Sequence, residues 1–304
     1  MFGAWGKTCI NCFVLITGYF MCKSNITIKK FIKLLCECMF YRIVIYLLFL
    51  VSGYVSFNIK ELVKTLIPIY NIKQNFTSCF LIFYLCIPFL NILIKHINEK
   101  QYIYLLAICL FTYVLMGTIP YFQVSMNYVS WFIVLYFIAS YIRLYPKNIY
   151  SNTKIWIILS LILILVACLS VVICYYLNLH PYLFVSDSNT FLALAIGICS
   201  FLLFNNLDIK YSKSINTVAS TTFGVLCIHA NSDTMRQWLW RDTLNNVEAY
   251  NTDYALLHAF GSTIMVFIVC ALIDLLRINY IEKPFLKVFS KYEDKILLNI
   301  NNLF

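Results

Sequence analysis

Long apolar runs alternate with short polar segments along the whole chain. Nine runs hold few or no charged residues, at positions 8–22, 38–57, 78–94, 102–120, 128–142, 155–179, 190–204, 217–229 and 254–276. A helix needs about 20 apolar residues to cross the hydrocarbon core of a bilayer, and several runs fall a little short of that length. The runs are continuous instead of alternating, which excludes a transmembrane β-barrel. The pattern predicts an all-α, polytopic integral membrane bundle of about nine transmembrane helices.

Composition extends this prediction to the full length of the chain. Of the 304 residues, 62% are apolar and 12% are charged, whereas soluble domains have about 45–50% and about 25%. A soluble globular protein is therefore excluded, and residues 1–304 are predicted to form a single membrane domain. Most of the 13 Cys lie inside apolar runs, which favours small hydrophobic side chains over disulfides or metal ligands. We expect no metal site.

The distribution of positive charge predicts how the bundle lies in the membrane. Of the 23 Lys and Arg, 17 fall in one alternating set of connecting segments. Cytoplasmic segments retain Lys and Arg, so the N-terminus is predicted outside and the C-terminus inside. Insertion also explains the net charge of +10 better than nucleic-acid binding does, because no basic stripe is long enough to follow a phosphate backbone. The expected partners include membrane lipids and no nucleic acid.

The predicted extracytoplasmic loop at 230–253 carries the most mixed chemistry in the chain. If the preceding helix continues past the membrane surface, His229 and Asp233 lie one turn apart on one face, where a carboxylate can hold an imidazole tautomer. Interleaved Arg and Trp side chains stack on and hydrogen-bond sugars, which favours a carbohydrate-facing loop. The alternative is an interfacial histidine beside an aromatic belt. The other candidate sugar-binding residues of the loop are Asn231, Arg236, Trp240 and Arg241.

A lysine cluster between the first two runs is the candidate anion site on the cytoplasmic side. Lys29 and Lys33 are spaced i, i+4, and Lys30 and Lys33 are spaced i, i+3. On a helix these spacings place the ammonium groups together, and phosphate is their natural ligand. The alternative is that the cluster only anchors the topology of the chain.

Two segments resemble motifs of one family of membrane enzymes. The segment 6–20, GKTCINCFVLITGYF, resembles the second-helix motif of the acyltransferase 3 family. The segment 220–229, STTFGVLCIH, is similar to a late helix in the polysaccharide-modifying branch of that family. Lys30 and Lys33 stand where the family has the arginines of a basic R-x-x-R element. Lysine lacks the bidentate grip of arginine on phosphate.

This resemblance implies a membrane O-acyltransferase, in most cases an O-acetyltransferase. Such an enzyme transfers an acyl group from cytoplasmic acyl-CoA, commonly acetyl-CoA, to a hydroxyl of a surface or capsular polysaccharide or of its lipid-linked precursor. It is a multi-pass protein of the plasma membrane. The resemblance gives Lys29, Lys30 and Lys33 to the CoA phosphates and His229 with its loop to the glycan. A general base must also remove the proton of the attacking hydroxyl.

In the resembled family this base is a histidine of the first helix, and no run here matches that helix. The sequence therefore predicts an N-terminally incomplete acyltransferase of uncertain activity, with His229 as the first candidate base. Asn11 lies inside the first run, where a polar group is expected to pair with a neighbouring helix. Without a preceding helix, Asn11 is expected to be open to lipid.

Two other functions stay open from the residues alone. One is a polysaccharide polymerase or a flippase for a lipid-linked glycan, and the other is an inactive, truncated membrane protein. A flippase is expected to carry more charged groups at membrane depth than the almost none counted in these runs, and a polymerase is expected to have a larger outer loop.

Overall fold

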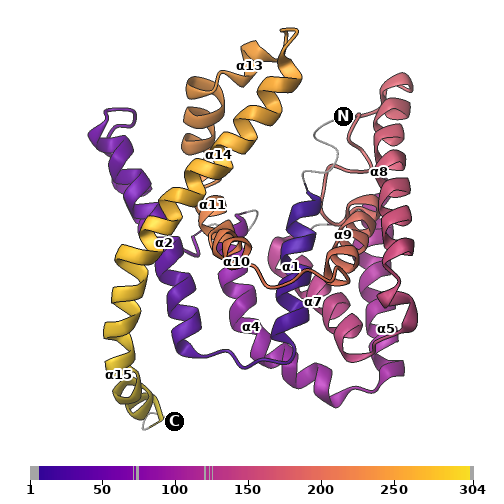
Figure 1. Cartoon of the computed structure of the whole chain (residues 1–304), viewed down its shortest axis with the longest axis horizontal. Coiled ribbons are helices and arrows are strands. Elements are labelled where there is room, and N and C mark those ends of the chain that lie inside the picture. Colours follow the sequence, from indigo (N-terminus) through magenta and orange to yellow (C-terminus); the bar gives the residue numbers. More distant parts are fainter. Residues whose placement is uncertain are drawn as a thin grey trace. The chain divides into compact units, whose positions relative to one another are not determined.

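The computed structural model describes residues 7–70, 72, 75–119, 121–122, 124 and 126–301, with side chains up to residue 292. These residues form helices and loops and contain no strand. They fall into two compact units, and Figure 1 shows helices joined by loops in the ribbon of the chain. Unit 1 takes the chain up to Ile26 and from Ile72 to Ile209, and unit 2 takes Thr27–Asn71 and the chain from Lys210 onward. Position 6 of the N-terminal motif and position 120 of the fourth apolar run lie outside the described residues.

The elements of the two units follow the apolar runs of the sequence. Those of unit 1 are α1 (Thr8–Met21), α4 (Phe76–His96), α5 (Glu99–Cys109), the π-helix η2 (Leu110–Leu115), α6 (Met116–Thr118), α7 (Tyr128–Leu144), the 3₁₀-helix η3 (Asn148–Ser151), α8 (Thr153–Tyr176) and α9 (Phe191–Asn205). Those of unit 2 are α2 (Ile28–Val51), α3 (Ile59–Leu66), α10 (Lys213–Ala219), α11 (Thr222–His229), α12 (Asp233–Arg236), the π-helix η4 (Gln237–Thr243), α13 (Asn246–Ala249), α14 (Ala255–Arg277), the π-helix η5 (Ile278–Glu282) and α15 (Lys283–Asn301).

Asparagine caps explain where many of these helices begin. A side-chain oxygen of the residue before the first turn accepts a hydrogen bond from a backbone N–H that has no partner within the helix. Asn98 does this for the Gln101 N–H, and the Gln101 side chain returns a bond to the Asn98 backbone. The helices α3, α4, α7 and α8 are capped in the same way, by the side chains of Asn58, Asn75, Asn127 and Asn152 respectively.

Unit 1 is built around α1, which packs against α7 and α9. Asn11 of α1 is fully buried, and its Nδ2 donates to the Ser188 carbonyl at 2.8 Å. Its Oδ1 accepts from Trp131 Nε1 of α7 at 3.0 Å. The expected pairing of Asn11 with a neighbouring helix is confirmed. The expectation that it is open to lipid is wrong, because α7 and the segment before α9 enclose it.

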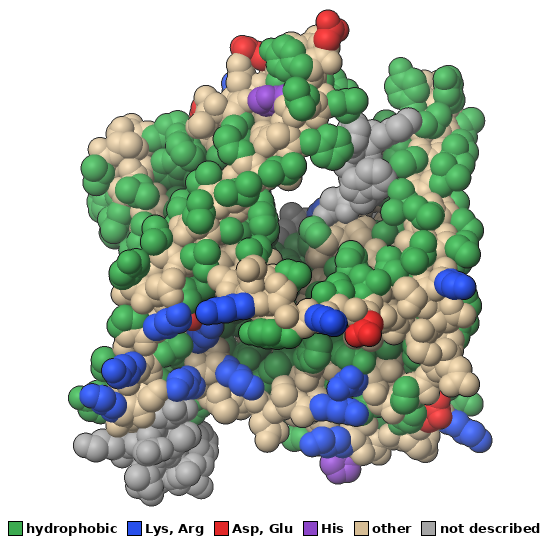
Figure 2. All heavy atoms as spheres, viewed as in Figure 1, with side chains coloured by type: hydrophobic (Ala, Val, Ile, Leu, Met, Phe, Trp, Pro, Cys, Tyr) green, Lys and Arg blue, Asp and Glu red, His purple; other side chains and the backbone are tan. Residues whose placement is uncertain are grey.

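Long apolar helices with exposed apolar side chains identify a membrane protein. Among the described residues, five helical stretches are long and apolar enough to cross a bilayer, and three shorter apolar helices, α1, α7 and α9, accompany them. Leu161 and Leu165 of α8 are 63% and 59% exposed, and hydrophobic side chains cover much of the surface in Figure 2. An all-α membrane bundle is thus confirmed. The number of nine crossings and the orientation of the ends are still predictions.

Three elements of unit 2 differ from the predicted boundaries. The second run was expected to begin at position 38, but α2 begins at Ile28, where Thr27 accepts a hydrogen bond from the Lys30 N–H. Lysine is a good helix former, so charge does not stop the helix there. The run 217–229 divides into α10 and α11, and α14 continues beyond position 276 through η5 into α15.

Candidate functional site

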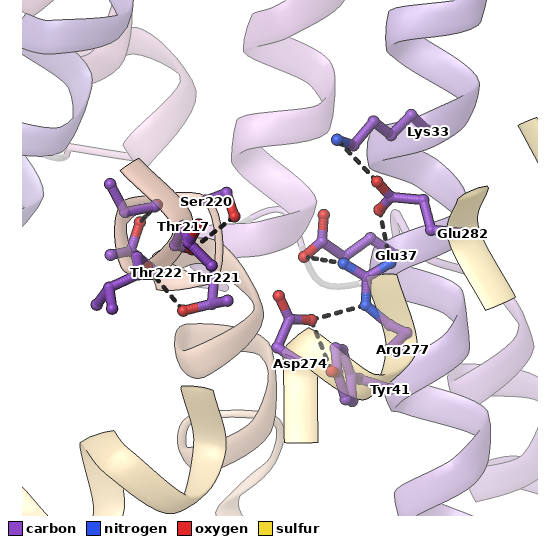
Figure 3. Close-up of polar contacts among 12 residues, drawn as sticks. Lys33, Glu37, Tyr41, Thr217, Ser220, Thr221, Thr222, Asp274, Arg277 and Glu282 are labelled. Atoms are coloured by element: carbon purple, nitrogen blue, oxygen red, sulfur yellow. Dashed lines mark hydrogen bonds and ion pairs between the residues drawn. The ribbon is translucent and has the colours of Figure 1, made fainter. Parts of the chain in front are cut away.

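A buried ion network lies where α2 meets the end of α14 in unit 2 (Figure 3). Arg277 is its centre. The Arg277 Nε donates to Asp274 Oδ1 at 2.7 Å, and Nη1 donates to Glu282 Oε2 at 2.8 Å. Nη2 lies 2.9 Å from Glu37 Oε1 of α2. All four residues are at most 8% exposed, so the guanidinium balances carboxylates that are removed from water.

Two more side chains complete this network. Lys33 Nζ lies 2.9 Å from Glu282 Oε1, and Tyr41 donates its hydroxyl to Asp274 Oδ1 at 2.7 Å. The network therefore opposes three carboxyl groups to one guanidinium and one ammonium group. Asp274 Oδ2 is buried and has no hydrogen-bond partner among the described residues. Because a buried charge without its partner is costly, these contacts fix the register of α2 against α14 and η5.

Sequence reasoning missed this network, although a signal was present. Glu37 borders the second apolar run and Asp274 lies inside the last one. Ionisable residues at such positions are expensive and usually pair with one another. Glu37 and Arg277 lie just outside these runs, where α2 and α14 continue as helix, and so they reach Asp274 inside the last run.

The late-helix motif contacts the same network through its glycine. A Cβ placed on Gly224 of α11 would lie 2.1 Å from Asp274 Cγ. Any side chain at this position would push α11 away from Asp274. The glycine is thus required by the close approach of α11 to α14.

The three candidate phosphate-binding lysines lie on the first turns of α2, as their spacing predicts for a helix. Two of them contact the α14–α15 helix. Lys29 Nζ donates to Ser290 Oγ of α15 at 2.6 Å, and Lys33 forms the ion pair with Glu282. Lys30 is exposed. The structure brings the cluster together at one end of α2, but Lys33 is already neutralised by a carboxylate.

His229 is the last residue of α11, and the helix does not continue to Asp233. Asp233 begins the separate helix α12, and its carboxylate accepts from Arg236 Nη1 at 2.7 Å. The proposed one-turn pairing of His229 with Asp233 is therefore absent, because Ser232 adopts an extended conformation between the two helices.

The ring of His229 is oriented by a backbone carbonyl instead. His229 Nδ1 lies 2.7 Å from the Val225 carbonyl oxygen. A carbonyl can only accept, so Nδ1 carries the hydrogen, and Nε2 of the neutral ring keeps its lone pair. His229 is half-buried, and Trp240 packs edge to face against it with the ring centres 6.5 Å apart. This arrangement leaves a basic nitrogen beside an aromatic ring.

The other candidate residues of the loop differ in their contacts and exposure. Asn231 donates to the Cys227 carbonyl at 3.0 Å, so its amide closes the end of α11. Arg236 and Arg241 are 54% and 70% exposed in their side chains. Asp242, a neighbour of Arg241, accepts from the Tyr54 hydroxyl, and Trp238 packs against Phe49 at the end of α2. The loop and the lysine cluster therefore lie at opposite ends of α2.

One comparison with known proteins identifies the family of the chain. The family model described as an acyltransferase domain, Acyl_transf_3, matches residues 1–275. No curated protein and no solved structure matches the chain. The matched residues include both motif segments, the lysines of α2 and the carboxylates Glu37 and Asp274. The chain therefore belongs to the acyltransferase 3 family, and the resemblance seen in its sequence is confirmed.

Proposed function

We propose that the chain is an O-acyltransferase of the plasma membrane. It takes an acyl group, with acetyl as the simplest case, from cytoplasmic acyl-CoA. It transfers this group to a hydroxyl of a cell-surface or capsular polysaccharide or of its lipid-linked precursor. The observation that carries the proposal is the family match over residues 1–275.

The donor end of the proposed site is the beginning of α2. Lys29 and Lys30 present ammonium groups on the first turn of the helix, and CoA carries several phosphate charges. Such groups attract phosphate through a field that salt screens. Lys33 contributes less to this attraction because Glu282 lies 2.9 Å from its ammonium nitrogen.

The acceptor end of the proposed site is the loop that follows α11. The lone pair of His229 Nε2 takes the proton of the sugar hydroxyl, and the oxygen attacks the thioester carbonyl. An ester bond forms, the C–S bond breaks, and the CoA sulfur leaves as the thiol after accepting a proton. Arg236, Arg241 and Trp240 suit the sugar by hydrogen bonding and stacking, with Asn231 and Asp233 beside them.

The test is acetyl transfer in membranes that contain the full chain. Vesicles receive radiolabelled acetyl-CoA, and label is measured as alkali-labile ester in the extracted polysaccharide. The wild-type chain is expected to label the glycan, and His229→Ala is expected to lower the rate about 10²-fold or more. His258→Ala is the matched control, because His258 also lies in unit 2 and is bound to Asn246.

Two results would count against the proposal in different ways. Wild-type membranes that consume acetyl-CoA without forming glycan esters would contradict the acceptor class. A rate that is unchanged in His229→Ala, with normal labelling in the wild type, would assign the base to another residue.

A further inference from the structure

We propose that the phosphates of acyl-CoA bind between α2 and α15, with Lys287 and Lys291 of α15 joining Lys29 and Lys30 of α2. This inference rests on acyl-CoA being the donor. It assigns a role to α15, which begins at Lys283 and so lies beyond the residues that match the family model.

The first support is the contact between the two helices. α15 packs against α2, and Lys29 Nζ donates to Ser290 Oγ at 2.6 Å. Ser290 in turn donates to the Leu286 carbonyl of its own helix. The serine hydroxyl thus holds the Lys29 ammonium group against α15. A phosphate group bound by Lys29 would therefore also lie beside the side chains of α15.

The second support is the position of the lysines on α15. Lys283, Lys287 and Lys291 recur every fourth residue and are exposed, so they form a stripe along one flank of the helix. Lys287 lies one turn before Ser290, and Lys291 directly follows it. Lys283 is held by Asn279 at 2.7 Å. In Figure 2, Lys and Arg side chains gather over α15 and the beginning of α2.

The third support is the balance of charge. The monophosphate and diphosphate groups of CoA together carry about four negative charges near neutral pH. Lys33 is paired with Glu282, and Lys29 and Lys30 bring two positive charges, which is half the number of negative charges on the phosphates. Lys287 and Lys291 are exposed and bring two further positive charges to the helix that Lys29 contacts.

The test measures acetyl-CoA binding to the full chain in nanodiscs of neutral phosphatidylcholine. The double variant Lys287→Gln/Lys291→Gln is expected to weaken binding about tenfold or more at low salt, with a smaller loss at high salt. If one of the two lysines holds the 3′-phosphate, the double substitution should weaken the binding of 3′-dephospho-CoA by a smaller factor than the binding of acetyl-CoA. The matched control is Lys95→Gln/Lys100→Gln, which removes the same charge from unit 1 and should leave the affinity unchanged.

The outcomes separate this inference from the proposed function. If Lys29→Gln/Lys30→Gln weakens binding and the α15 variant does not, the inference is overturned and acyl-CoA stands as the donor. If the wild-type chain does not bind acetyl-CoA, the proposed function itself fails. If the α15 variant binds acetyl-CoA normally but retains less phosphatidylglycerol during purification, the stripe serves lipid headgroups and the inference is overturned.

Discussion

Single residues in unit 2 set how closely its helices approach. Gly224 is the sharpest example, because a Cβ there would lie 2.1 Å from Asp274 Cγ. Gly261 of α14 is the opposite case, since a Cβ there would meet no atom within 4 Å. Close packing therefore requires glycine at position 224 but not at position 261. Neither residue has a positive φ angle that would require glycine.

Gly224→Ala is expected to lower the stability of the chain by about 1–3 kcal/mol, the usual range for overpacking. The added methyl must separate α11 from α14 or displace the Asp274 carboxylate from Arg277. Gly261→Ala should instead raise stability by about 0.5–1 kcal/mol, because alanine favours the helix. Thermal unfolding of both variants in the same detergent measures this, and equal shifts would contradict the packing argument.

At the scale of elements, the sequence predicted most helices and missed the contacts between them. The apolar runs locate α4, α7 and α8 within a few residues, because this signal is local. Glu37 and Arg277 lie 240 positions apart in the sequence, and no local pattern indicates that they meet. The pairing of His229 with Asp233 was predicted from helical spacing, and it failed because Ser232 begins a new helix.

The network between α2 and α14 is expected to make unit 2 sensitive to the loss of its shared cation. Arg277→Met would leave Glu37, Asp274 and Glu282 buried without their shared cation, and breaking a buried pair in this way costs about 3–5 kcal/mol. Arg277→Lys should cost less, since one ammonium keeps the charge but cannot reach all three carboxylates. Chemical unfolding in detergent measures both variants.

Arg241→Met is the matched control for this prediction. Its side chain is 70% exposed and lies 4.0 Å from Asp242, so its ion pair is expected to contribute about 0–1 kcal/mol. A loss in Arg277→Met no larger than in Arg241→Met would show that the network does not hold the helices together.

At the scale of the whole molecule, the family and the helical membrane fold could be predicted from the sequence. The motif at 220–229 has a steric reason for its glycine, because Asp274 lies so close to Gly224 that a side chain there would collide with it. The division into two units could not be predicted, because unit 2 joins α2 to helices that follow position 210. Contacts over that separation depend on packing and leave no periodic signal along the chain.

Unit 2 also leads to a prediction about sidedness. α2 has 24 residues and is about 36 Å long at 1.5 Å per residue, compared with a hydrocarbon core of about 30 Å. Lys29 and Lys30 lie at its beginning, and Trp238 packs against Phe49 near its end. The lysines and the loop after His229 are thus separated by a helix long enough to cross the bilayer.

We therefore expect the loop after His229 outside and the lysines of α2 in the cytoplasm, since 17 of the 23 Lys and Arg fall in the segments predicted to be cytoplasmic. Alkaline phosphatase is active only after export, so a fusion after Asn246 should be active and one after Lys213 inactive. The crossing between these sites must use both α10 and α11, because the eight residues of α11 extend only about 12 Å. Green fluorescent protein at the same two sites is the complementary control and should fluoresce only after Lys213. The reverse pattern in both reporters would place acyl-CoA and the lysines on different sides of the membrane, and the proposed donor site would then be untenable.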